Sequence, residues 1–346
     1  MKVSVMQGIR NVVEEERAIP AISENEVLIK VMDCGVCGSD VHYYEFGRIG
    51  DFVVEKPMVL GHECSGLVVQ AGKNVKNVKA GDLVAVEPGY TCGKCEYCKK
   101  GLYNLCPDVI FLATPPYDGA FAEFLKYPAD MVYKLPDNMD TEEGALIEPF
   151  CVGLHAVAQS EGKVGNSAVI LGSGCIGLCT LLALHATGIN QVYVVDMLQK
   201  RLDMAKHLGA TEVINAGSQD VLQTISELTN GKGVGLVFET AGSKVTTQQT
   251  AKLVKRGGTV VLVGMAANPV FEYDFGTLQG KEAKLHTVFR YRNLYPVAIE
   301  AVSKGHLPLK SIVTDRYDFA HISDALEDSI YRKAEIVKAV IHISEA

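Results

Sequence analysis

Residues 167–178 are SAVILGSGCIGL, and residues 191–196 are QVYVVD. An apolar run in the first segment ends at Gly172, and Gly174 and Gly177 complete the pattern G-x-G-x-x-G. The pattern follows a predicted strand and opens a predicted helix, as in a dinucleotide-binding βαβ unit. In such a unit the first glycine allows a tight turn and the second lets the backbone approach a pyrophosphate. The third lets helix and strand pack closely.

An acidic residue supports this interpretation. Asp196 ends the second segment, about 20 residues after Gly177. A carboxylate there can accept hydrogen bonds from both ribose hydroxyls of the adenosine, and it repels a 2′-phosphate. The sequence therefore predicts NAD rather than NADP as the cofactor. The competing interpretation is a structural turn with an incidental acid, and the complete strand–turn–helix context argues against it.

The hydrophobic pattern changes at about residue 150. From residue 166 onward, strand-like runs such as GLVFET (235–240) and GTVVLVG (258–264) alternate with helix-like stretches such as 175–188 and 198–210. This alternation predicts a doubly wound parallel sheet, whose strands are buried on both faces. The earlier part instead shows short apolar runs broken by glycine, proline and charge, which favour strands joined by turns.

Composition limits the protein class. A length of 346 residues predicts two domains at roughly 150 residues each. Charged residues make up 21% and hydrophobic residues 48%, which is typical of a folded soluble chain. The formal charge of −8 opposes binding to nucleic acid or to anionic membranes, and we find no apolar run long enough to span a bilayer. The first residues show no secretory signal, so we expect a cytoplasmic protein.

Four of the ten cysteines crowd into one loop. Cys92, Cys95, Cys98 and Cys106 form the pattern C-x2-C-x2-C-x7-C. In a reducing compartment, clustered thiols bind metal more often than they form disulfides. Four thiolates leave a zinc ion no open position, so this loop predicts a structural zinc site. Disulfides or free thiols are the alternatives.

A second candidate metal set is dispersed along the chain. It contains Cys37, His62 and Glu63, with Glu148 further on in LIEPF. Each residue also has a plain structural interpretation: a small buried hydrophobe, a hydrogen-bonded turn residue or a solvated acid. Their spacing alone leaves both interpretations open.

These residues resemble the zinc-dependent medium-chain alcohol dehydrogenases, and among them the sorbitol (polyol) dehydrogenases. GHECSGLVVQAG fits that family's zinc pattern, GHE-x2-G-x5-G. Further similar segments extend from about residue 34 to 300, and they include CGSDVHYYEFGRIG, KPMVLGHE, YNLCPD, ATPPYDG, KLPDN, EEGALIEP, GGTVVLVG and VFRYRNLYPVAI. The resemblance implies an α/β fold in which a GroES-like β-barrel catalytic domain (1–151, completed by 289–346) surrounds an inserted Rossmann domain (152–288).

The resemblance also implies a catalytic zinc site. It makes Cys37, His62 and Glu63 the zinc ligands and places Glu148 beside the metal, often through the bound water. Cys151 is the rival to Glu148, and the acid of the IEP segment is favoured. With the four-cysteine loop, the expected content is two zinc ions per chain. Cys34 and Cys64 occupy no ligand position.

Further roles follow from the same resemblance. Ser39 and His42 match a hydroxyl–imidazole proton relay; surface packing is the alternative for His42, with Glu148 and water moving the proton instead. The substrate-binding residues are Tyr43, Phe111, Glu148, Arg290 and Tyr291. An arginine fork suits vicinal hydroxyl oxygens, and a domain-interface salt bridge is its alternative. The cofactor-binding residues beyond the glycine turn and Asp196 are Ile176, Arg201, Val263, Gly264, Met265, Val288, Phe289 and Arg290.

The expected function is therefore NAD- and zinc-dependent oxidation of a secondary alcohol of a polyol of the sorbitol, xylitol or iditol type to a ketose. A threonine-type or 2,3-butanediol-type zinc dehydrogenase is the alternative within the family. A non-catalytic zinc protein that binds nucleic acid is the alternative from another class, and the negative charge and the complete nucleotide unit oppose it. Family resemblance alone suggests a homotetramer.

Overall fold

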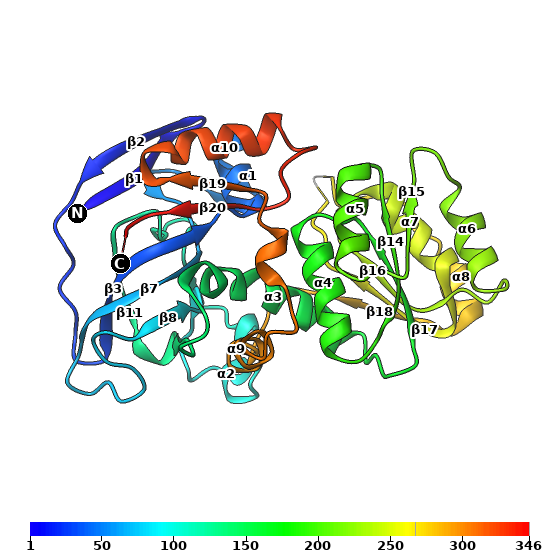
Figure 1. Ribbon diagram of the computed structural model, residues 1–346, viewed down its shortest axis with the longest axis horizontal. Helices are drawn as coiled ribbons and strands as arrows, with labels where there is room; N and C mark the ends of the chain where they lie inside the picture. The colour runs from blue at the N-terminus through cyan, green and yellow to red at the C-terminus, as the bar shows by residue number, and fades with distance from the viewer. Residues whose placement is uncertain (267, 346) are drawn as a thin grey trace. The chain divides into compact units, whose positions relative to one another are not determined.

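The computed structural model describes residues 1–266 and 268–345 and contains two compact units (Figure 1). The first unit combines Met1–Glu148 with the chain from Tyr295 onward. The second unit is Pro149–Leu294. The two ends of the chain therefore build one unit, and the middle of the chain builds the other. Among the described residues, no helix combines the length and apolarity that crossing a bilayer requires.

The junctions between the units lie a few residues away from the expected ones. The first follows Glu148 rather than residue 151, and the second follows Leu294 rather than residue 288. Helix α3 (Thr141–Gln159) continues through the first junction, and α9 (Tyr295–Ser303) begins directly after the second. Because neither junction is a glycine- or proline-rich linker, the sequence pattern does not mark it.

The first unit is organised around strand β3 (Glu26–Gly35), which lies inside a seven-stranded sheet. The order is β12-β8-β7-β3-β20-β19, and β11 also pairs with β3. Val27, Ile29 and Val31 are fully buried, because alternate side chains of a strand point to the same face. The other strands of this sheet are β7 (Glu63–Ala71), β8 (Leu83–Val86), β11 (Phe124–Pro128), β12 (Val132–Lys134), β19 (Asp315–Asp318) and β20 (Ala339–His342).

Smaller elements complete the first unit. A three-stranded sheet contains β1 (Lys2–Gly8), β2 (Asn11–Glu16) and β6 (Met58–Val59). Two-stranded pairs join β4 (Arg48–Ile49) to β5 (Phe52–Val53) and β9 (Gly89–Tyr90) to β10 (Ile110–Phe111). The remaining helices are α1 (Gly38–Phe46), α2 (Glu96–Lys99), α10 (Ile322–Tyr331) and the 3₁₀ turns Tyr103–Leu105, Ala129–Met131, Leu309–Ile312 and Phe319–His321.

The C-terminal segment joins the N-terminal one through backbone pairing. Strand β20 runs antiparallel to β3, with Val340 opposite Gly35 and Ile341 opposite Cys34. Figure 1 shows the red β20 beside the blue β3, and α10 packs against α1. The last part of the chain therefore lies next to the segment that carries Cys37.

The second unit is a six-stranded parallel sheet in the order β15-β14-β13-β16-β17-β18. The order reverses between β13 and β16, the point at which open sheets of this kind bind nucleotides. The predicted doubly wound parallel sheet is confirmed. Its elements are β13 (Ser167–Leu171), β14 (Gln191–Asp196), β15 (Glu212–Asn215), β16 (Val234–Glu239), β17 (Val254–Leu262), β18 (Lys284–Thr287), α4 (Cys175–Ala186), α5 (Gln199–His207), α6 (Val221–Leu228), α7 (Lys244–Leu253) and α8 (Phe275–Lys281).

Candidate functional site

The structure brings Cys37, His62 and Glu63 together. One potential ligand atom from each residue lies within 4.8 Å of the others. Cys37 follows β3 as the N-cap of α1, and Glu63 opens β7 opposite Gly35 of β3. His62 and Glu63 are buried. A thiol, an imidazole and a carboxylate form a donor set that suits zinc with an open fourth position.

A buried carboxylate that sequence reasoning missed holds this group in place. Asp40 accepts hydrogen bonds from the backbone N–H of Cys37 (3.0 Å) and of Gly61 (2.9 Å), and its Oδ1 lies 3.5 Å from His62 Nδ1. Burial opposes ionisation of Asp40, but His62 and the N–H donors hold the pKa of its carboxyl below the usual value. Burial also disfavours a charged His62, yet Asp40 and Cys37 raise the pKa of that imidazole well above its usual value.

The Asp40–His62 arrangement is the kind that orients metal-binding histidines, because the carboxylate fixes which ring nitrogen carries the proton. The local sequence contains a signal for it. Asp40 stands three residues after the helix N-cap, where an acidic side chain reaches back to the N-cap N–H.

A second missed residue reaches Glu63 from the C-terminal segment. Lys338 directly precedes β20, and its ammonium forms an ion pair with Glu63 Oε2. Lys338 Nζ also donates to the backbone oxygen of Val36 at 2.9 Å. No sequence motif marks this lysine, because the contact joins residues far apart in the chain.

Glu148 lies on α3 and is buried, but it is not part of the three-residue group. Its charge acts on Cys64, the residue after Glu63: burial, together with Glu148, raises the pKa of Cys64 to about 12. The role of Glu148 beside the metal stays a prediction. Cys151 belongs to the second unit and is completely buried.

Other predicted residues also belong to the first unit, and one of them contacts His62. Phe111 is buried, with its ring centroid 5.5 Å from that of His62. Ser39 and His42 lie on α1, and His42 packs against Phe46 at 4.8 Å between ring centroids. Tyr43 on the same helix is buried.

The four-cysteine loop forms a second group of potential ligands. Cys95 Sγ lies 3.4 Å from Cys98 Sγ, and Cys106 Sγ lies 3.6 Å from Cys92 Sγ. None of the four forms a disulfide among the described residues. Backbone N–H groups of Lys94 and Cys95 stabilise the Cys92 thiolate and lower its pKa to about 7. Convergent thiols with backbone donors fit a tetrahedral zinc ion.

The glycine turn of the second unit has the tight backbone conformation that the G-x-G-x-x-G motif predicts. Gly172 has a φ of +105°, which an L side chain rarely adopts. A Cβ on Gly177 would lie 1.9 Å from the backbone oxygen of Gly172, so only glycine allows this close approach. By contrast, the nearest atom to a Cβ on Gly174 is Arg201 Nη1 at 3.7 Å. The turn is therefore open at Gly174, with Arg201 beside it.

Asp196 is held by four donors. Its Oδ2 accepts from the backbone N–H (2.7 Å) and hydroxyl (2.9 Å) of Ser173, and its Oδ1 accepts from the N–H groups of Met197 and Leu198. The carboxylate is thus fixed at the end of β14 beside the glycine turn. Sequence reasoning missed Ser173, which occupies the first variable position of the motif.

Most of the remaining cofactor candidates follow β17 and β18 directly in the chain. The N–H groups of Val263 and Gly264 donate to the backbone oxygen of Glu239, and Val288 N–H donates to Leu262. Met265 is exposed, Ile176 is half-buried on α4, and Tyr291 is buried. The Arg290 guanidinium lies over the Phe289 ring, 4.9 Å from its centroid.

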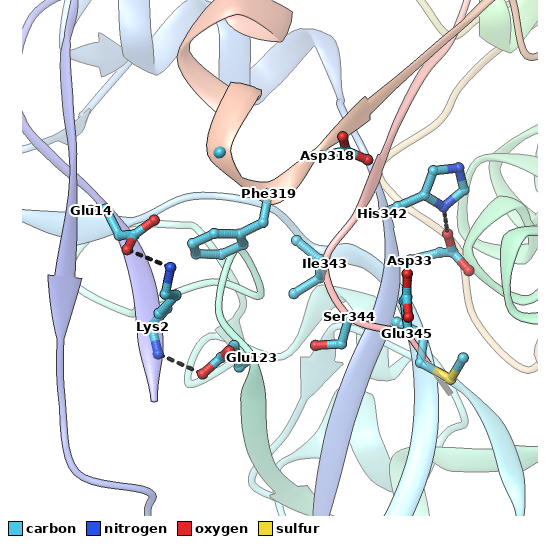
Figure 2. Close-up of a pocket in the computed structure, with 12 residues that line it drawn as sticks. Lys2, Glu14, Asp33, Glu123, Asp318, Phe319, His342, Ile343, Ser344 and Glu345 are labelled. Atoms are coloured by element: carbon cyan, nitrogen blue, oxygen red, sulfur yellow. Dashed lines mark hydrogen bonds and ion pairs between the residues drawn. The ribbon is translucent and has the colours of Figure 1, made fainter.

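Figure 2 shows a pocket of about 720 Å³ on the first unit. Asp33 and His342 form an ion pair on one side of it, and Phe319 points into it. Of the described residues that line this pocket, none is a candidate metal ligand. We therefore place the candidate chemistry at the Cys37–His62–Glu63 group and not in this pocket.

Two families match the chain. The alcohol dehydrogenase GroES-like domain matches residues 23–137, and the zinc-binding dehydrogenase family matches residues 175–304. The first match confirms the GroES-like domain expected from the sequence. The second covers most of the parallel sheet.

Known proteins resemble the chain over nearly its full length. Sorbitol dehydrogenase of Bacillus subtilis (strain 168) is 44% identical over 342 residues, which cover 99% of this chain and 97% of that protein. Among solved structures, an Escherichia coli oxidoreductase/dehydrogenase of unknown specificity has a TM-score of 0.96 at 45% identity, over 99% of both chains. The 2R,3R-butanediol dehydrogenase of Bacillus subtilis has a TM-score of 0.91 at 30% identity, also over 99% of both chains. The chain belongs to the zinc-dependent medium-chain alcohol dehydrogenase family and is similar to its sorbitol dehydrogenases.

Proposed function

We propose that the protein oxidises a secondary alcohol of a polyol of the sorbitol, xylitol or iditol type to a ketose, with NAD as the hydride acceptor. The observation that carries the proposal is the Cys37–His62–Glu63 group, whose donors suit a catalytic rather than a closed zinc site. Full-length likeness to a sorbitol dehydrogenase supports the polyol class. The alternative is a threonine-type or 2,3-butanediol-type dehydrogenase, and the likeness to a butanediol dehydrogenase at lower identity favours it less.

Cys37, His62 and Glu63 would hold the catalytic zinc. When bound, such an ion acts as a Lewis acid that lowers the pKa of an alcohol hydroxyl. The thiolate and the carboxylate formally neutralise its two charges. Asp40 keeps the His62 ring oriented through the contact described above.

We assign proton handling to Glu148, Ser39 and His42. Glu148 is buried and its charge acts on Cys64, the residue after Glu63, which supports its role as the acceptor that orients water or takes the proton. Ser39 and His42 share helix α1 with the Cys37 N-cap, which supports a relay from the metal group along that helix. The four cysteines Cys92, Cys95, Cys98 and Cys106 would bind a structural zinc.

For the cofactor, we propose NAD bound at the glycine turn. Asp196 is fixed beside the turn by Ser173, and its negative charge disfavours a 2′-phosphate. The other proposed cofactor residues are Gly172, Gly174, Ile176, Gly177, Arg201, Val263, Gly264, Met265, Val288, Phe289 and Arg290. The proposed polyol contacts are Tyr43, Phe111, Glu148, Arg290 and Tyr291, and they rest on family likeness. The same likeness is the support for a cytoplasmic homotetramer.

Metal analysis tests the two sites. We expect purified wild-type protein to contain two zinc ions per chain by mass spectrometry. His62→Ala should retain one ion and lose turnover, because it removes a catalytic ligand and leaves the cysteine loop intact. Cys95→Ala should lower the Tm by about 4 °C or more, the effect of losing about 2 kcal/mol in a domain of this size. One zinc ion in the wild type, or two in His62→Ala, would contradict the assignment.

Cofactor preference tests Asp196. We expect wild-type kcat/KM to be much higher with NAD than with NADP, and Asp196→Ala to reduce that ratio at least tenfold, or by about 1.4 kcal/mol. Asp203→Ala on the exposed side of α5 is the matched control and should keep the wild-type ratio. Equal activity of the wild type with both cofactors would show that Asp196 does not face the ribose.

A pair of variants separates Glu148 from Cys151. Glu148→Gln keeps the size of the side chain but removes a proton acceptor, so turnover should fall by about 10²-fold or more while zinc stays bound. The pH profile of kcat should lose one limb. Cys151→Ser should show near-normal activity in folded enzyme. If Cys151→Ser instead releases zinc and Glu148→Gln is mild, the site uses two thiolates and the polyol assignment weakens with it.

A further inference from the structure

We propose that Lys338 is a positioning residue for the catalytic metal: its ammonium holds one carboxylate oxygen of Glu63, so that Glu63 presents only its other oxygen to the ion. This inference rests on the proposed metal role of Cys37, His62 and Glu63. Lys338 would act through Glu63, without touching substrate or cofactor. The consequence is a metal that receives less charge from Glu63 and stays a stronger Lewis acid.

The Lys338 and Glu63 side chains are buried and closely packed, so neither can move far from the other. Both side chains are about 2% exposed, and the ion pair joins Lys338 Nζ to Glu63 Oε2. A Cβ on Gly35 would lie 2.1 Å from Glu63 Oε2 and 2.9 Å from Lys338 Cε, so the pair packs directly against the backbone of β3. Among the described residues, Glu63 Oε2 accepts no further hydrogen bond. Lys338 is thus the group that holds this oxygen.

The backbone around Lys338 is also fixed. Its carbonyl oxygen accepts from the N–H of Thr314 at 2.9 Å, and the carbonyl of the next residue, Ala339, accepts from Val36 N–H at 2.9 Å. The lysine therefore approaches from an anchored strand end and not from a mobile loop. A side chain that merely filled space there would not need a charge.

The positive charge of Lys338 offsets part of the negative charge around the metal group. Asp40 and Glu63 are both buried, Asp40 Oδ1 lies 3.5 Å from His62 Nδ1, and Cys37 adds a thiolate when it binds metal. These three negative charges exceed the two positive charges of a zinc ion, and the buried Lys338 reduces the surplus. A buried ion pair is weak evidence for stability, because desolvation offsets the attraction. We therefore propose that the Lys338–Glu63 pair positions a metal ligand, rather than that it stabilises the fold.

Cobalt substitution provides the test, because Co²⁺ in place of zinc reports coordination through its visible absorption. We compare the wild type with Lys338→Met, which removes the charge and shortens the side chain by one atom, and with Lys338→Arg, which keeps the charge. In Lys338→Met both Glu63 oxygens become available to the catalytic-site cobalt. The d–d absorption of that ion should fall severalfold, because its coordination number rises. kcat should fall about 10- to 100-fold, the usual effect of losing an outer-shell partner, with KM little changed. Lys338→Arg should retain the wild-type spectrum.

Controls separate this inference from the proposed function. His62→Ala removes a ligand of the catalytic site, so its cobalt spectrum comes from the cysteine loop alone. If the wild-type spectrum shows no bands beyond those of His62→Ala, the catalytic metal centre itself is contradicted. Lys134→Met removes another lysine–carboxylate pair of the same unit, with Asp82, and should leave the spectrum unchanged. Should Lys338→Met not fold, Lys338→Gln is tested in the same way. A neutral variant that folds and keeps the wild-type cobalt spectrum and kcat would overturn the role of Lys338.

Discussion

Strand β3 pairs with β7 on one side and with β20 on the other, and the candidate metal site depends on this pairing. The register places Gly35 opposite Glu63 and opposite Val340 at the same time. Because Gly35 has no side chain, Glu63 and Lys338 can meet across it. The chain then turns into α1 through Cys37, whose N–H is bound by Asp40, and Asp40 in turn contacts His62.

In the second unit, too, a glycine allows a close contact that positions a charged side chain. Gly177 allows α4 to approach Gly172, and this contact sets the shape of the turn that ends β13. Ser173 in that turn holds the Asp196 carboxylate at the end of the neighbouring strand. Buried Glu239 binds the N–H groups of Ala241 and Gly242 after β16, on the other side of the turn. In both units, backbone geometry at glycines decides where the charged side chains lie.

Much of this arrangement could be predicted from the sequence, because local patterns determine it. The alternation of strand-like and helix-like runs predicted the parallel sheet, and the cysteine spacing indicated the loop whose thiols converge in the structure. The missed residues depend on contacts that no local pattern contains. Lys338 meets Glu63 only because β20 joins β3, and Ser173 occupies a motif position that tolerates many residues. The unit junctions were displaced because α3 runs through one of them.

The central claim is that distant parts of the first unit converge on one catalytic metal ion. Anomalous diffraction at the zinc absorption edge, from crystals of the zinc-loaded protein, tests it most directly. The account predicts a peak bonded to Cys37 Sγ, a ring nitrogen of His62 and one oxygen of Glu63, with a separate peak among the four loop cysteines. The absence of the first peak, or its position on Cys151 without Glu63, would contradict the account.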